Sequence, residues 1–552
     1  MKQSKIVNRF FALIIGWLCA WTLNIEERML FFVIFLGCSC IAIIILESCK
    51  PEIKSIILAS LFSFFIVISY SVEHCYPLLS GKSGIAVLLL AFFLQYGVRI
   101  INETLVVREE KVLSAWIWYI LPIILFLGWL PHLLYNYPGS LCYDARDQLE
   151  QAFGFLPLDN KNPVFDTLLY GTLFKAGRQL TGIDNAGITV IAFTQYLLMA
   201  LSFSCAMYEG FKLTQSKVFI VGSVLFYILI PIFGGAGQII LKDSLHMSMF
   251  VFMFASQLRV LRKPTKKAIV LYAISVILVS ITRAMALVYA VLGGVLMVLV
   301  FVCRRRELGY YMLGAVSSAI GVVLLWECVI LPHWEIKEYP SVEKYCLPFN
   351  QIAYVVVTDE LSETERVAID SVLNVERIKT EYTSNSADYL KVIFHEGDMT
   401  LFWKFYLTCY LKHTKAMIKG PILSYHKYVY PLAIGKDNYR SYIADCSGMG
   451  LNLYYKDEVK RLKMENYIRW WEQNPLLKLF MGPGLYCWIL LFCVMFCRSN
   501  LRVSLIPLIL LFLGLFFTPI NGETRYAFPI LATSPLMVAM CTALSDESKI
   551  TL

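Results

Sequence analysis

The chain has 552 residues, of which 58% are hydrophobic and 16% are charged, and its formal net charge is +9. Soluble domains are usually about half apolar and about a quarter charged, so this composition argues against a soluble globular protein. The positive charge does not indicate a nucleic-acid-binding protein, because the Lys and Arg residues lie in short loops between apolar blocks and not in a basic domain. The blocks are roughly 17–25 residues long, the length that a membrane-spanning helix needs.

The apolar blocks predict an all-α polytopic membrane protein with about 14 transmembrane helices. A helix is expected because it satisfies the backbone hydrogen bonds within the segment itself. The apolar stretch from Ile269 to Cys303 is too long for one span, and Arg283 divides it into two. In chain order the predicted spans are residues 10–25, 29–46, 55–72, 84–101, 115–135, 185–208, 217–234, 244–258, 268–282, 285–303, 309–331, 477–497, 503–519 and 526–543.

The charges of the loops predict the orientation of the spans. When the N-terminus is placed in the cytoplasm, the short loops on the other side hold only isolated cations, namely Arg28, Lys82, Lys242, Arg283 and Arg525. This asymmetry predicts a multi-pass protein of the plasma membrane with both termini in the cytoplasm. The cytoplasmic loops then hold Lys50, Lys54, Arg108, Lys111, Lys212, Lys217, Arg259, Arg262, Lys263, Lys266, Lys267, Arg304, Arg305, Arg306, Arg498 and Arg502.

Two long polar segments fall outside the cytoplasm in this topology, and the second is long enough for a small domain. Cys346 and Cys446 share that second segment, and whether they form a disulfide stays open. The predicted domains are four N-terminal spans at 1–114, a core of spans at 115–331 with the first outer loop at 136–184, an extracytoplasmic and mainly helical domain at 332–475, and C-terminal spans with a short cytoplasmic tail at 476–552.

The first outer loop contains two predicted short helices. One runs from Asp144, which could be its N-cap, to Gly154, which could end it. The other begins near Val164, directly after Pro163. Both are amphipathic, which favours a position in the membrane interface.

Asp144 and Asp147 are the candidate catalytic acids. They stand three residues apart on the first short helix, so their side chains would face similar directions. A carboxylate at the membrane surface could act as a general base on an acceptor hydroxyl. The alternative is structural, with Asp144 as a helix cap and Asp147 as a solvated acid in the first turn.

The candidate cations belong to separate outer loops. Arg283 could bind a phosphate through two hydrogen bonds, or it could form a structural ion pair or extend to the interface. Lys242 and Asp243 could simply pair within their loop, and Arg525 with Tyr526 could anchor a span at the interface. All of these groups gather at one face, whereas a transporter more often has ionisable groups near mid-membrane. This distribution favours an enzyme that acts on a lipid-borne phosphate.

A family resemblance follows from the order of these motifs. The run Tyr137–Gln148, followed by Asn162-Pro163-Val164-Phe165, resembles the first outer loop of a bacterial multi-pass membrane family of unknown function that is itself similar to the GT-C glycosyltransferases. No single motif is diagnostic, and the resemblance covers the chain from about residue 115 onward. Its further matches are Lys242-Asp243, Thr282-Arg283, the run from Pro348 to Ala353, and the run from Arg525 to Pro529.

The resemblance implies transfer of a sugar from a polyprenyl-phosphate or polyprenyl-diphosphate carrier to an extracytoplasmic glycan or protein acceptor, by an inverting mechanism. It makes Asp144 the first choice for the acid and Asp147 the second, with Arg283, Lys242 and Arg525 as ligands of the donor phosphate. Some relatives use a divalent metal such as Mg²⁺ or Mn²⁺, which Asp144 could hold with water molecules; no cofactor is certain. The candidates for the substrate pocket are Asn162, Asp243, Gln351 and Tyr526.

One position departs from the pattern expected by resemblance, because a His is expected before Pro163 and this chain has Asn162. Two other functions also fit the sequence. A polysaccharide polymerase or ligase would use the same face with a lipid-diphosphate-linked oligosaccharide, and a lipid or solute transporter or flippase would need a polar path across the membrane.

Overall fold

A computed structural model of the chain describes residues 2–23, 28–48, 52–78, 80–104, 114–283, 285–336, 341–395, 397–436 and 438–543. It shows a multi-pass helical membrane protein. Among the described residues, eight helical segments are long and apolar enough to cross a bilayer. They are α3 (Ile53–Glu73), α4 (Gly81–Thr104), α5 (Ile117–Tyr135), α8 (Asp184–Thr214), α11 (Lys242–Arg262), η1 with α13 (Leu287–Arg304), α14 with η2 and α15 (Arg306–His333), and α24 to η8 (Asn500–Phe517).

A ninth crossing arises if α9 (Lys217–Leu229) and α10 (Pro231–Gln238) form one span bent by 58°. The remaining predicted blocks are also helical, but their helices do not meet the same length and composition requirements over the described residues. The count of fourteen spans therefore stays a prediction. The helices concerned are α1 (Lys2–Thr22), α2 (Arg28–Ser48), α12 (Lys266–Ile281), α23 (Pro483–Phe496) and α26 (Phe528–Cys541). Lys50, Arg108 and Lys111, which belong to the predicted loop charges, lie outside the described residues, as does the end of the predicted C-terminal tail.

The main hydrophobic core is built around α8, which packs against α5, α7 (Val164–Thr181), α11 and α26. Its aromatic centre includes Phe203 and Tyr227, whose ring centroids are 4.5 Å apart. The indole of Trp129 donates to the Tyr227 carbonyl oxygen at 2.7 Å, so a buried polar group is also satisfied there. This core holds the helix ends that carry the candidate site.

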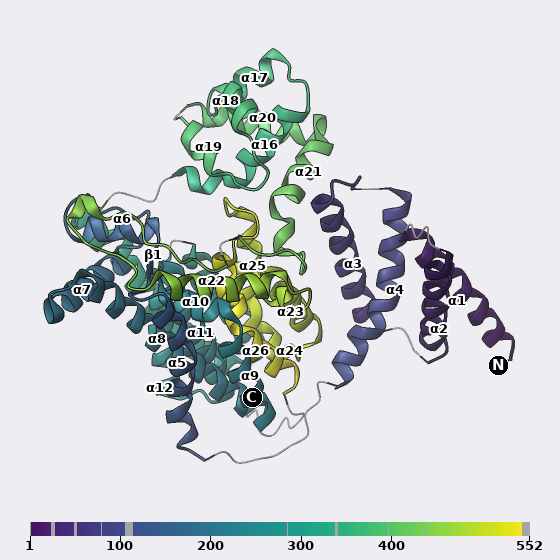
Figure 1. Ribbon diagram of the computed structural model, residues 1–552, viewed down its shortest axis with the longest axis horizontal. Coiled ribbons are helices and arrows are strands. Elements are labelled where there is room, and N and C mark those ends of the chain that lie inside the picture. Colours follow the sequence, from purple (N-terminus) through teal and green to yellow (C-terminus); the bar gives the residue numbers. More distant parts are fainter. Residues whose placement is uncertain are drawn as a thin grey trace.

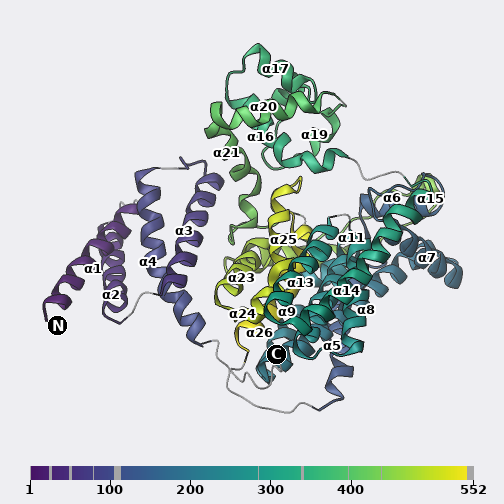
Figure 2. The same ribbon diagram turned by 180° about the vertical axis from the view of Figure 1, so that it is seen from behind.

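Helices α1 to α4 stand beside the core as a separate group (Figures 1 and 2). Helix α3 supplies contacts to the core, including an edge-to-face pair between Phe62 and Trp488 with centroids 4.7 Å apart. At one end of α3, Glu73 Oε1 lies 2.9 Å from His426 Nε2. The first four helices therefore attach to the core through a limited contact.

A pair of two-residue parallel strands is an exception to the all-α class. Strand β1 (Ser140–Leu141) pairs with β2 (Ile239–Ile240), and Ala444 N donates to the Leu141 carbonyl oxygen at 2.9 Å on the other side. Helix α6 (Tyr143–Ala152) begins soon after β1, and α11 begins soon after β2. Because the strands are parallel, the N-termini of these two helices lie together at the carboxyl end of the strand pair.

The glycines before β2 are needed for close packing. A Cβ atom at Gly234 would collide with the His132 ring, and one at Gly237 would collide with the Tyr196 ring. These collisions explain why the sequence from Gly234 to Gly237 is glycine-rich without the spacing of a nucleotide-binding loop. Helix α10 is thereby held against α5 and α8.

A second hydrophobic core lies in a group of helices at one end of the molecule, which we call the α16–α21 unit (Figures 1 and 2). Backbone hydrogen bonds from Ala387 N to Pro519 O (2.6 Å) and from Asn521 N to Asn385 O (3.0 Å) join it to the segment before α26. Its helices are α16 (Cys346–Thr358), α17 (Glu363–Asp370), α18 (Val375–Glu381), α19 (Asp388–Ile393), α20 (Met399–Lys412) and α21 (Thr414–Tyr425).

The rest of the predicted domain at 332–475, including α22 (Glu458–Gln473), packs on the main core. Cys346 consequently lies in the second core and Cys446 in the main core, and the two form no disulfide with each other. The thiol of Cys446 donates to the Ala444 carbonyl oxygen at 3.3 Å.

Candidate functional site

The β1–β2 pair positions the two central residues of the site. Asp144 is the second residue of α6, and Lys242 is the first residue of α11. The thiol of Cys142 donates to the Ile240 carbonyl oxygen at 3.2 Å, which continues the contact between the two segments toward these helices. Two helix N-termini therefore point at one place, and their peptide dipoles favour negative charge there.

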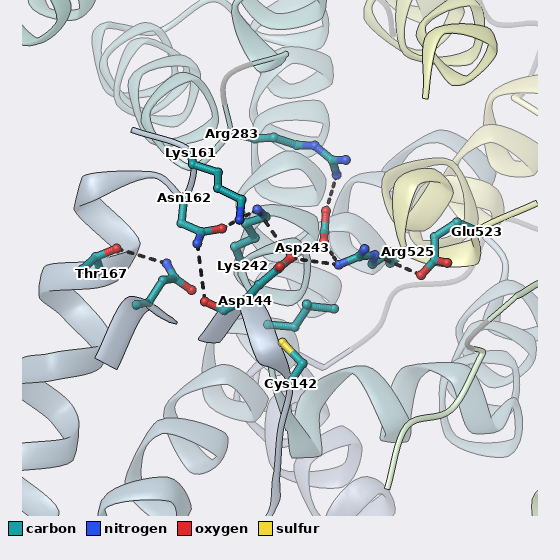
Figure 3. Close-up of polar contacts among 12 residues, drawn as sticks. Cys142, Asp144, Lys161, Asn162, Thr167, Lys242, Asp243, Arg283, Glu523 and Arg525 are labelled. Carbon is teal, nitrogen blue, oxygen red and sulfur yellow. Dashed lines mark hydrogen bonds and ion pairs between the residues drawn. The ribbon is translucent and has the colours of Figure 1, made fainter. Parts of the chain in front are cut away.

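Asp144 is an acceptor for two cations (Figure 3). Its Oδ2 lies 3.2 Å from Arg525 Nη1 and 3.6 Å from Lys242 Nζ. Burial raises the pKa of the Asp144 carboxyl, but Lys242 and Arg525 outweigh burial and hold the pKa well below its usual range. The expected role as helix cap is wrong, because Cys142 occupies the N-cap position and Asp144 lies in the first turn. Gly154, with φ of 82°, follows α6 as expected, and α7 begins at Val164 as expected.

Lys242 also contacts the second short segment of the site. Its Nζ donates to Asn162 Oδ1 at 2.6 Å, and Asn162 Nδ2 donates to the Asp144 carbonyl oxygen at 3.4 Å. Asn162 therefore holds Lys242 beside Asp144, which gives the residue before Pro163 a positioning contact in this chain.

Asp243 and Lys242 are neighbours in sequence but do not pair with each other, so the expected simple loop pair is wrong. Asp243 forms a short ion pair with Arg283, and its other oxygen lies 3.7 Å from Arg525 Nη1. The Asp243 side chain is 1% exposed. The guanidinium carbon atoms of Arg283 and Arg525 each lie 5.1 Å from the centroid of the Tyr526 ring. Both guanidinium groups therefore lie within cation–π distance of the Tyr526 ring.

Glu523 extends this ion network on its buried side. Its Oε1 lies 2.9 Å from Arg525 Nε and 2.9 Å from Arg440 Nη2, and its side chain is fully buried. Arg525 therefore contacts Asp144, Asp243 and Glu523 at once. Positive and negative groups alternate from the partly exposed Asp144 to the buried Glu523. Lys242, Arg283 and Arg525 also line the cavity beside this network.

A cavity of about 570 Å³ opens beside this network. Its polar end is lined by Asp144, Lys242, Arg283 and Arg525, together with Lys161. Much of the remaining lining is apolar and comes from the π-helical turn η1 (Leu287–Leu292), from α25 (Ile506–Gly514) and from η8 (Leu515–Phe517). The apolar lining side chains include Met285, Val288, Leu510, Leu511, Leu515 and Phe517. The cavity thus suits an amphipathic ligand with an anionic head.

The α16–α21 unit contributes to the rim of the same cavity through Asp388 and Lys391, and Lys344 from the preceding turn also lines it. Asp388 Oδ1 lies 3.0 Å from Lys391 Nζ. Six cations and two carboxylates therefore line the cavity in the described part of the chain. The excess of positive charge favours a ligand with more than one negative charge.

Two of the candidates from the sequence lie elsewhere. Asp147 accepts from Arg146 Nη2 at 2.8 Å and is not among the cavity-lining residues. A step of three residues on a helix leaves about 60° between side chains, which is enough to direct Asp147 away from Asp144. Gln351 is fully used inside the second core, where it donates to Tyr410 and Met417 and accepts from Tyr406 at 2.6 Å.

A buried hydrogen-bonded chain beneath the cavity was not anticipated from the sequence. Tyr289, which lines the cavity, lies 2.6 Å from His246 Nε2, and His246 Nδ1 lies 2.9 Å from Thr282 Oγ1. The Thr282 hydroxyl donates to the carbonyl oxygens of Leu278 and Val279 at 3.0 Å. An ionisable residue within a spanning helix is a signal of function, and His246 carried that signal. Arg440 and Lys344 offered no comparable signal, because only the fold brings them here.

Among the described residues, no group of three or more His, Cys, Asp or Glu side chains is arranged to hold a metal ion. The carboxylates of the site are instead neutralised by Lys and Arg side chains. This donor set does not fit a divalent metal held by the protein alone.

Comparison with known proteins identifies a family match. The model of a family of unknown function (DUF6020) matches residues 155–551, which is more than two thirds of the chain. The matched part includes Asn162, Lys242, Asp243, Arg283 and Arg525, and it begins after Asp144. No curated protein and no solved structure matches the chain.

Proposed function

The chain belongs to the family of unknown function DUF6020, and from its site we propose that it is a membrane glycosyltransferase that moves a sugar from a polyprenyl-phosphate or polyprenyl-diphosphate carrier to an acceptor outside the cytoplasm. The observation that carries the proposal is the cavity itself. Its lining combines a carboxylate and the cations Lys242, Arg283 and Arg525 with apolar side chains from the spanning helices. A phosphate head on a prenyl chain has the same two halves.

In this proposal the donor phosphate takes the place of Asp144 as a partner of Lys242 and Arg525. Phosphate oxygens are strong acceptors, and both Lys242 and Arg525 now satisfy the Asp144 carboxylate. Once these contacts are given up, the pKa of Asp144 rises from its depressed position toward its ordinary range. Donor binding would therefore convert a carboxylate engaged in ion pairs into a better general base.

The transfer step then needs one base and several cations. Asp144 accepts the proton of the acceptor hydroxyl, the acceptor oxygen forms a bond to the anomeric carbon, and the bond from that carbon to the phosphate oxygen breaks. The phosphate leaves with the electron pair, and Lys242, Arg283 and Arg525 stabilise its charge. Because attack and departure occur on opposite faces, the configuration at the anomeric carbon inverts.

The finer architecture belongs to the same proposal. We infer a GT-C-like arrangement with about 14 spans. The protein would lie in the plasma membrane, with both termini in the cytoplasm and the cavity on the outer side. The positions of the basic loop residues support this orientation. A polymerase or ligase would differ in its donor, a lipid-diphosphate-linked oligosaccharide, and a flippase would move the carrier without cleaving it.

The test combines carrier binding with sugar transfer. Purified wild type, Asp144→Asn and Asp147→Asn would be incubated with radiolabelled polyprenyl-phosphate sugars and a crude cell-envelope acceptor. We expect Asp144→Asn to retain the lipid but to transfer label about 10²–10⁴-fold more slowly, the usual contribution of a general base. Asp147→Asn is the matched control, from the same helix but outside the cavity, and should transfer at the wild-type rate.

Other outcomes decide among the rivals. If Lys242→Gln and Arg283→Gln retained carrier lipid at the wild-type level, the donor phosphate would not bind in this cavity. Movement of intact labelled carrier across proteoliposomes, without transfer, would favour the flippase. Use of only diphosphate-linked oligosaccharides would favour the polymerase or ligase, and binding of no carrier lipid would overturn the proposal.

A further inference from the structure

A second pocket, of about 270 Å³, lies at the end of the spanning helices opposite the candidate site. It is formed by α5, α8, α11 and α12. Helix α11 begins at the candidate site with Lys242 and reaches this pocket with Arg259. At a rise of about 1.5 Å per residue, these positions are about 25 Å apart, close to the thickness of a hydrocarbon core. The pocket therefore belongs to the other membrane interface.

The lining of this pocket changes from apolar to polar toward that interface. The deeper lining residues are Pro122, Leu201, Phe252 and Leu271, and the outer ones include Ser204, Ser256, Tyr208, Glu209 and Arg259. Along α8 and along α11 the order of residues follows this gradient. Trp118 and Tyr208 meet edge to face with centroids 4.8 Å apart, as aromatic side chains do at a membrane interface. A phospholipid, with an apolar acyl chain and a polar headgroup, has the same change in polarity along its length.

At the polar end of this pocket, Arg259 is the cation that is available to a ligand. Glu209 is bound by Arg262, whose Nη2 and Nε lie 2.8 Å and 3.2 Å from its Oε2. The Lys212 ammonium lies 5.3 Å from the Tyr208 ring centroid. Arg259 lines the pocket, and within the described part of the chain no carboxylate lies within 4.0 Å of its guanidinium. One carboxylate thus faces three cations, and Arg259 is the one that the pocket exposes to a ligand.

Ser204 provides a second, independent sign of a ligand. Its hydroxyl is buried in the wall of the pocket, and among the described residues it has no hydrogen-bond partner. The neighbouring Ser256 is satisfied, because its hydroxyl contacts Ser275 at 2.9 Å and the Met253 carbonyl oxygen at 2.9 Å. A buried hydroxyl without a partner costs free energy, which a phosphate oxygen at this position would recover.

We propose that this pocket binds an anionic phospholipid of the adjacent leaflet, with its phosphate on Arg259 and Ser204 and one acyl chain against Leu201, Phe252 and Leu271. Arg259 can bind a phosphate through two hydrogen bonds, and Ser204 can donate one more. The loops at the same end carry further cations, including Lys217 and Lys263, which attract anionic lipid to this interface. The proposal is independent of the glycosyltransferase function, because it concerns different residues at the other end of the spans.

The test measures lipid binding to the purified full chain in detergent by native mass spectrometry. Phosphatidylglycerol and phosphatidylcholine would be titrated separately into wild type, Arg259→Gln, Ser204→Ala and Lys266→Gln. We expect wild type to bind the first phosphatidylglycerol about tenfold more tightly than phosphatidylcholine, the effect of one charge-assisted contact. Arg259→Gln should bring the two affinities to parity, and Ser204→Ala should weaken phosphatidylglycerol binding by a few fold. Lys266→Gln is the matched control, an exposed cation of the same end outside the pocket.

Each other outcome overturns the proposal. A preference that survives Arg259→Gln would place the lipid elsewhere. A preference lost equally in Lys266→Gln would show diffuse attraction by the basic loops rather than a site. Full competition by inorganic phosphate at a matched phosphate concentration would assign the pocket to free phosphate instead of lipid. Ser204→Ala keeps every charge, so its effect on phosphatidylglycerol binding still tests the pocket if Arg259→Gln does not fold.

Discussion

Arg525 is the residue on which the charges of the site converge. It contacts three carboxylates, and its side chain is 12% exposed. Removing it would leave Asp243 and Glu523 as buried charges with fewer partners, which costs about 3–5 kcal/mol when a buried pair is broken. A loss of activity on Arg525→Ala would therefore mix destabilisation with loss of ligand binding. Lys242 is the better substitution for a binding experiment, because among the described residues its one carboxylate partner within ion-pair distance is Asp144, whose side chain is 31% exposed.

The hydrogen bonds of His246 fix the direction in which the Tyr289 hydroxyl donates. Because the Thr282 hydroxyl donates to backbone carbonyls, it can only accept from His246 Nδ1–H. His246 Nε2 is then an acceptor when the ring is neutral, and the Tyr289 hydroxyl must donate to it. The Tyr289 oxygen keeps its lone pairs, and because Tyr289 lines the cavity we expect them to accept from a ligand hydroxyl.

We therefore expect Tyr289→Phe to weaken binding of a polyprenyl-phosphate sugar by about tenfold, since it removes an acceptor while keeping the aromatic wall. Binding of unglycosylated polyprenyl phosphate should change by less than about twofold. Equilibrium binding of both lipids to purified protein measures the difference. Val288→Ala, from the same wall of the cavity, should affect the two lipids equally. Equal losses for both lipids in Tyr289→Phe would show that the hydroxyl does not read the sugar.

At the scale of elements, the sequence predicted the helices well and the connections poorly. The described part of each apolar block is helical, although the block at 217–234 is divided between α9 and α10, because a 17–25-residue apolar segment has few other ways to satisfy its backbone in lipid. The β1–β2 pair could not be foreseen, because each strand has only two residues and carries no periodicity. That pair sets Asp144 beside Lys242, so the sequence identified both residues without predicting how they meet. Thr282-Arg283 and Arg525 were found because charge at a helix end is rare in such segments.

Helix α17 of the α16–α21 unit is joined to α20 by a carboxylate whose pKa is shifted. Glu365 accepts from the Ser362 backbone N–H at 2.8 Å and from Lys412 Nζ at 2.6 Å, and His413 Nε2 lies 3.5 Å from its Oε1. Burial raises the pKa of Glu365, but the bonds from Lys412 and Ser362 outweigh burial and lower it from 4.5 to about 2. Because the pKa is lower in the folded state, the contribution to stability is complete above 4.5 and is lost as the pH falls toward about 2.

We expect Glu365→Gln to lower the melting temperature at pH 7, and we expect its difference from wild type to shrink as the pH falls from 4.5 to about 2. A loss of about 1–3 kcal/mol for a charge-assisted bond corresponds to a shift of about 1–3 °C when the whole chain unfolds together. Differential scanning fluorimetry of the purified chain across this range measures both values. Glu363→Gln, an exposed acid of the same helix, should show no such pH dependence. A difference that stays constant to pH 2 would contradict the role of the Glu365 charge.

At the scale of the whole molecule, the class of protein followed directly from composition, whereas the division into units did not. The predicted domain at 332–475 is split between two cores, because residues from about 425 onward return to the main core. The backbone bonds from Ala387 and Asn521 further tie the α16–α21 unit to the segment that leads to Arg525. Such contacts join positions more than 100 residues apart, and one sequence offers no pattern that predicts them. Gln351 illustrates the limit, since its polar side chain serves the second core and not the site.

The orientation of the chain can be tested with thiol labelling from one side of the membrane. Cys75 is an exposed cysteine in the loop after α3, which the loop charges place outside. A cysteine introduced by Lys266→Cys would lie at the basic end of α12, which the same charges place inside. In right-side-out vesicles, a membrane-impermeant maleimide should modify Cys75 and spare the residue at 266, and inside-out vesicles should reverse the result. Peptide mass spectrometry identifies each site. Because the cavity lies at the end of α11 that begins with Lys242 and the basic loops at the end with Arg262, the reversed pattern would place the cavity in the cytoplasm and exclude an extracytoplasmic acceptor.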